Sequence, residues 1–263
     1  METAQLISKY GDIKKLTCPS GFEVVIREQN GEDDGILSNV SLNKDSIAIN
    51  TFIQEIVVWA DFGNTPDKRL TENQVLNMRL RDKYYILLSS RIFSLGPNLK
   101  FEYEWDPTKP AVPYEEDLSR FIWDFSKPLP NPDSKDYPHE AIQAYNEPIT
   151  TTHTTRTLST GKEVQFKYMD GHSEKYLIEL PEYQLTVNSR LVARDLHLKV
   201  EGDWIPVENF SVFKSREMVE LRNMMEEVDA QFNGTIDIEN PANGEVMTQY
   251  LIRLNSFFYP REI

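Results

Sequence analysis

The feature that most constrains the fold of this 263-residue sequence is a segment of its first half that recurs in its second half. Residues 17–27 align with residues 157–167, an offset of 140 residues. In both segments a Ser or Thr followed by glycine (Gly21 and Gly161) precedes apolar side chains at every second position. A period of two is typical of a half-buried strand, and the glycine supplies the positive φ of a tight turn. The repeat therefore predicts a turn followed by a strand in each half.

An amphipathic helix follows the predicted strand in each half. The first spans residues 70–95, with Thr71 and Gln74 as a capping box at its start and Gly96 after its end. Apolar side chains recur at helical spacing in both helices: Leu76, Leu80, Tyr84, Leu87, Leu88 and Ile92 in the first, and Met218, Leu221, Met225, Val228 and Phe232 in the second.

A short alternating strand follows each helix, at residues 101–104 and at residues 236–239, and each strand soon meets a proline. The same order of turn, strand, helix and strand thus occurs twice. This shared order predicts an internal duplication. Chance similarity between short strands is the alternative that the sequence leaves open.

The sequence predicts an α+β fold with two related lobes, residues 1–105 and 156–263. Each lobe is long enough to bury a core of its own. Residues 106–155 join the lobes and contain eight of the 15 prolines of the chain. Proline lacks a backbone donor and fixes φ, so we expect this stretch to be an extended arm without a regular sheet or a long helix.

An apolar cluster interrupts the arm. Phe121, Ile122, Trp123 and Phe125 lie together in a stretch that a solvated tether would leave polar. We define these four residues as the aromatic knot and predict that they bind a partner protein, because aromatic anchors dominate protein interfaces. Docking of the knot on the chain's own lobes is the alternative that stays open.

A second aromatic cluster, Phe257, Phe258 and Tyr259, lies close to the last residue of the sequence. Chain ends usually fray unless they are tied down, so we expect these side chains to be buried. They are predicted to bind a partner, with burial in the chain's own core as the alternative.

The charge of the chain disfavours two classes of partner. Against 28 Lys and Arg the sequence has 42 Asp and Glu, a formal net charge of −14. Nucleic-acid phosphates and acidic lipids attract the opposite charge, so neither is an expected partner. The first residues lack the basic start and apolar stretch of a signal peptide, and no apolar run approaches the ~20 residues that span a bilayer. We expect a soluble protein, made in a cytoplasm and not inserted in a membrane.

No motif in the sequence indicates a catalytic centre. Gly-rich phosphate loops, a nucleophile elbow and the His-Glu-x-x-His element are all missing. The single cysteine, Cys18, aligns with Leu158, which indicates a small apolar filler. The acidic run at residues 32–34 lacks the ligand spacing of a calcium loop and is interpreted as a solvated turn, and the carboxylates of residues 102–106 as the solvated face of a strand. We predict no catalytic residue, no cofactor, no bound metal and no small-molecule substrate.

The order of these motifs resembles that of the baseplate hub and tail assembly chaperone family of T-even-type contractile-tailed bacteriophages. The similar segments are a helix at residues 82–91, a hairpin at 160–167, an acidic-Gly turn at 200–203, a helix at 220–229, a Pro–Gly element at 240–244 and an aromatic tail at 257–260. In the family the Pro–Gly element reads C-P-x-C-G. Here Asn240 and Asn243 replace both cysteines, so the family's zinc is not carried over.

The resemblance implies a structural or assembly protein of a phage tail baseplate, either a hub component or a hub assembly chaperone, with no catalytic residues to transfer. Its expected partners are other tail and baseplate proteins. Its expected location is the host cytoplasm during assembly or the baseplate of the virion. Two other classes stay open: a soluble ligand-binding module with an apolar pocket, unrelated to phage, and a hydrolase with an acidic active site.

Overall fold

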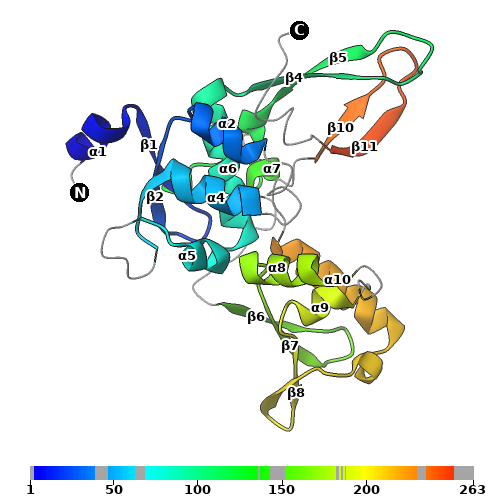
Figure 1. Cartoon of the computed structure of the whole chain (residues 1–263). Helices are drawn as coiled ribbons and strands as arrows, with labels where there is room; N and C mark the ends of the chain where they lie inside the picture. Colours follow the sequence, from blue (N-terminus) through cyan, green and yellow to red (C-terminus); the bar gives the residue numbers. More distant parts are fainter. Residues whose placement is uncertain are drawn as a thin grey trace.

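The computed structural model describes residues 3–38, 47–62, 69–135, 137–142, 152–181, 184, 186, 188–229 and 235–251. It has the predicted α+β fold, with helices packed on several small antiparallel sheets (Figure 1). Within these residues no helix is both long enough and apolar enough to cross a bilayer.

The first half of the chain builds a three-stranded sheet covered by helices. Its elements are α1 (Thr3–Tyr10), β1 (Ile13–Thr17), β2 (Glu23–Arg27), α2 (Gly31–Leu37), α4 (Ile47–Ile56), β3 (Val57–Ala60), α5 (Glu72–Asn77) and α6 (Leu80–Leu95). The sheet order is β1-β2-β3, and both pairings are antiparallel. The predicted turn before β2 is present, and Gly21 adopts a φ of +88°, which glycine reaches without strain.

The helix predicted over residues 70–95 is divided into α5 and α6. The predicted capping box begins α5, and Gly96, with a φ of +82°, ends α6. Between the two helices Met78 and Arg79 are extended, and Arg79 forms an antiparallel β-bridge with Asp170. A contact with the second half of the chain therefore interrupts a helix that the local sequence would continue.

The second half repeats this arrangement with one additional strand. Its elements are β6 (His153–Thr157), β7 (Glu163–Lys167), α8 (Gly171–Glu179), α9 (Ser189–Val192), β8 (His197–Val200), β9 (Asp203–Pro206), η3 (Phe210–Val212) and α10 (Ser215–Asp229). The sheet order is β6-β7-β8-β9, and Gly161 has a φ of +86° at the predicted turn. The stripe predicted for α10 is buried at Met218, Leu221, Met225 and Val228, whereas Phe232 lies outside the described residues.

Equivalent contacts hold the turn of each half against its long helix. Ser20 Oγ donates to Asp82 Oδ2 over 2.6 Å, and Thr160 Oγ1 donates to Glu217 Oε1 over 2.5 Å. Each acid is the third residue of its helix, α6 or α10. The duplication itself stays a prediction, which these equivalent contacts support.

Each half ends in a β-hairpin, and the two hairpins pack against each other (Figure 1). The hairpins are β4 (Asn98–Tyr103) with β5 (Val112–Asp117), and β10 (Thr235–Glu239) with β11 (Val246–Leu251). Phe101 stacks on Tyr114 of its own hairpin and on Tyr250 of the other, with ring centroids 5.5 and 5.4 Å apart. The expectation that residues 106–155 contain no regular sheet is wrong for β5 and for the first three residues of β6. Pro113 of β5 is tolerated because β5 pairs on one side only within the described residues.

The described residues form two large hydrophobic cores. The first contains side chains of the first half together with Ile236 and Ile238 of β10, whereas the buried side chains of the second come from residues 158–228 alone. We call residues 3–142 with 235–251 the body, and residues 152–229 the module. The predicted C-terminal lobe therefore contributes its last hairpin to the core of the other lobe, because the apolar side chains of β10 are buried there.

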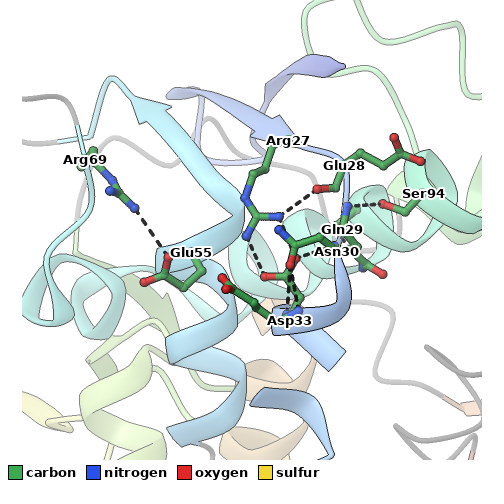
Figure 2. A network of polar contacts seen from close by, with 10 residues as sticks. Arg27, Glu28, Gln29, Asn30, Asp33, Glu55, Arg69 and Ser94 are labelled. Atoms are coloured by element: carbon green, nitrogen blue, oxygen red, sulfur yellow. Dashed lines mark hydrogen bonds and ion pairs between the residues drawn. The ribbon is translucent and has the colours of Figure 1, made fainter. Parts of the chain in front are cut away.

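The interpretation of residues 32–34 as a solvated turn is wrong. They form the first turn of α2, and only 1% of the Asp33 side chain is exposed. Arg27 Nη1 and Nη2 each donate to an Asp33 carboxylate oxygen over 2.7 Å (Figure 2). Asn30 caps the helix, and its backbone N–H donates to Asp33 over 2.8 Å. The acidic run is thus a helix start anchored to the end of β2.

Candidate protein-binding surfaces

The aromatic knot begins at Phe121, the last residue of η1 (Leu118–Phe121), and the only later helix of the predicted arm that the structure describes is α7 (His139–Ile142). Leu118 is fully buried, and Phe121, Ile122 and Phe125 pack, partly buried, against the core of the body. The structure therefore places the knot on the chain's own body. A partner-binding role for the knot stays a prediction.

Tyr85 of α6 anchors the knot. Its hydroxyl donates to the backbone oxygen of Trp123 over 3.0 Å, and its ring meets the edge of Phe125 with centroids 5.4 Å apart. Burial raises the pKa of Tyr85, so the hydroxyl remains a donor throughout the physiological range. The buried indole Nε1 of Trp123 has no hydrogen-bond partner within the described residues. The hydrogen bond from Tyr85 and ring packing thus hold the knot on α6, while the Trp123 Nε1 is a buried donor left unsatisfied.

The other predicted sites lie at the C-terminal end of the chain. Phe257, Phe258 and Tyr259 are outside the described residues. The Pro–Gly element at residues 240–244 is the loop between β10 and β11. There Asn240 Oδ1 accepts the backbone N–H of Ala242 over 3.0 Å, and the Asn240 backbone oxygen accepts that of Gly244 over 2.8 Å. Amide and backbone hydrogen bonds therefore shape this turn.

A further candidate surface, which the sequence reasoning did not single out, is the hairpin of β8 and β9. It lies at the end of the module farthest from the body (Figure 1). Its two-residue turn is formed by Glu201 and Gly202, with φ of +53° and +103°, as type I′ hairpin turns require. The acidic-Gly pair at residues 201–202 is the sequence signal for this turn.

One face of this hairpin is apolar, and the apolar side chains extend past the part of the face that packs against the core of the module. Leu198 packs against the core of the module, and Ile205 lies directly opposite it on β9. Val200 lies two residues after Leu198 and therefore on the same face. Val200 and Ile205 are nevertheless 42% and 47% exposed. We call Val200 and Ile205 the apolar tip. Both lie on the face of the sheet that packs against the core, but they are exposed to solvent.

Cys18 and Asp82 are buried titratable groups beside the turn that precedes β2. Cys18 is fully buried, as a filler is expected to be, and burial followed by the charge of Asp82 raises the pKa of its thiol. Burial also raises the pKa of Asp82, against two hydrogen bonds from Ser20. No three His, Cys, Asp or Glu side chains of the described residues are placed to hold a metal ion.

Comparison of the chain with protein-family models, with curated proteins and with solved structures finds no match.

Proposed function

We propose that this chain is a structural or assembly protein of a contractile phage tail baseplate, a hub component or a hub assembly chaperone, that acts by binding other tail proteins. The family resemblance of the sequence supports the phage context. The observation that carries the binding role is the apolar tip. Two large aliphatic side chains on an ordered hairpin lose contact with water only when another molecule covers them.

The geometry of the tip suits protein binding. Behind it, Lys199 bonds to Glu163 over 2.5 Å, and Trp204 lies opposite Lys199, whose ammonium group is 5.6 Å from the indole centroid. The hairpin is thus stiffened on its polar face while the apolar face stays open. A preordered apolar surface binds with a smaller loss of conformational entropy than a flexible one.

The test is complex formation with the tail and baseplate proteins encoded beside this chain. Each candidate is mixed with the purified chain, and the complexes are sized by chromatography with light scattering. We expect one of them to form a stable complex that the double variant Val200→Asp/Ile205→Asp weakens at least tenfold, because burial of two carboxylates replaces burial of two aliphatic side chains.

The matched control is Val246→Asp. Val246 is a 52% exposed valine on β11, in the body rather than the module, and its variant should bind as the wild type does. Equal binding by the wild type and the double variant would show that the apolar tip is not part of the interface. If no tail protein forms a complex with the chain, the proposed phage function is wrong.

A further inference from the structure

The body and the module have separate cores and meet at a polar junction. Among the described residues, the hydrophobic cluster of the body contains none of the module's buried residues, and that of the module contains none of the body's. The start of α6 supplies cations to the junction, Arg79, Arg81 and Lys83, and the module supplies carboxylates, Asp170, Glu174 and Asp229. The two surfaces are therefore complementary in charge.

Backbone contacts set the register of the junction. The N–H of Leu80 donates to the oxygen of Met169 over 2.9 Å, beside the β-bridge between Arg79 and Asp170. The guanidinium of Arg79 lies over the ring of Tyr168, with its carbon 4.2 Å from the centroid. These contacts join the gap between α5 and α6 to the segment that leads from β7 into α8.

Two of the cations at the junction, Arg81 and Lys83, are buried, and the three carboxylates are partly buried. Arg81 Nη2 donates to the backbone oxygen of Val228 over 3.3 Å. Lys83 is 1% exposed; its Nζ donates to Asn50 Oδ1 over 2.7 Å and lies 3.8 Å from Glu174 Oε2. Burial lowers the pKa of Lys83, and the carboxylates of Glu174 and Asp170 oppose that shift. Opening the junction would return these groups to water and recover part of their desolvation cost.

Gly171, the first residue of α8, permits the close approach. A Cβ on this residue would collide with Lys83 Nζ and would lie 2.8 Å from Leu76 Cα. Its counterpart in the repeat is Gly31, the first residue of α2, where a Cβ would have no neighbour within 4 Å. Glycine at position 171 is therefore required by the contact between module and body rather than by its own helix.

We propose that the module is a rigid unit that docks on the body through a releasable latch, formed by Gly171 against Lys83 and Leu76 and by the charge pairs around them. Release reorients the module and its apolar tip while both cores stay folded. A polar interface without shared apolar burial opens at much lower cost than a hydrophobic one. The latch is a property of the single chain and does not depend on a phage partner.

The test compares Gly171→Ala with Gly31→Ala in the full chain. Spin labels are placed through Glu32→Cys on α2 and Glu226→Cys on α10, both exposed helical sites; buried Cys18 does not compete for the label. We expect Gly171→Ala to shift the label–label distance distribution and to broaden it, because the added methyl group separates α8 from α5 and α6. Gly31→Ala should keep the wild-type distribution.

Glu174→Arg is the second variant, because it places a cation beside Lys83 without adding a Cβ to Gly171. It should shift and broaden the distribution in the same way, and circular dichroism should report an intact fold for both variants. If Gly171→Ala and Glu174→Arg both keep the wild-type distance distribution, the proposal of a latch is wrong. Loss of both cores in either variant would also overturn it, because a releasable module must come away without unfolding the body.

Discussion

Asp33→Ala tests the ion pair between Arg27 at the end of β2 and Asp33 in the first turn of α2. The substitution leaves Arg27, which is 11% exposed, without its bidentate partner. Breaking a buried ion pair from one side costs about 3–5 kcal/mol, because the remaining charge stays desolvated. Arg27 also donates to the backbone oxygen of Glu28 over 2.8 Å, which places the cost near the lower limit, about 3 kcal/mol. Loss of the capping bond to Asn30 adds about 1 kcal/mol.

We therefore expect Asp33→Ala to lower the free energy of unfolding of the body by about 4 kcal/mol. The assay is urea denaturation followed by tryptophan fluorescence, which reports mainly on the body because Trp59, Trp105 and Trp123 lie there and only Trp204 lies in the module. Adding Arg27→Met to Asp33→Ala should recover most of the loss, because no unpaired buried charge remains.

The matched control for Asp33→Ala is Glu55→Ala. Glu55 and Arg69 form an ion pair in the same region (Figure 2), with an N–O distance of 3.7 Å and side chains that are 50% and 46% exposed. Exposed pairs contribute little, so the control should change stability by at most ~0.5 kcal/mol. Equal losses in Asp33→Ala and Glu55→Ala would refute the assignment of the Arg27–Asp33 pair as a buried anchor.

Two further predictions concern pH and backbone conformation. Hydrogen bonds from Thr160 and then from the Lys214 N–H lower the pKa of Glu217 from 4.5 to about 2, so its stabilising effect is present above pH 4.5 and is lost as the pH falls toward 2. The stability difference between wild type and Glu217→Gln in urea titrations should therefore shrink from pH 5 to pH 3; a constant difference would contradict the assignment. Gly21→Ala should lower stability by about 1–2 kcal/mol, since its φ is +88° and no atom crowds its Cβ position, so the cost is conformational. Gly35→Ala within α2 should raise stability by about 0.5–1 kcal/mol. The same sign for both glycine variants in thermal unfolding would refute the conformational argument.

Local signals in the sequence predicted the elements that depend on neighbouring residues. The turns at Gly21 and Gly161 were predictable because a positive φ is a property of the glycine itself. The stripe of α10 was predictable because its buried face has the helical period. The acidic run at residues 32–34 looks like a solvated turn in the sequence, because the contacts that make it a helix start are the cap at Asn30 and the pairing of Asp33 with Arg27.

Turn chemistry and periodicity act over a few residues, so the sequence alone predicts the α+β class and the two similar sets of hairpin, helix and strand. The tertiary structure alone decided three other features: the break at Met78 and Arg79, the return of β10 to the core of the body, and the exposure of the apolar tip. Each depends on residues far apart in the chain, and no local pattern encodes which distant surface will cover an apolar face or pair with an extended backbone.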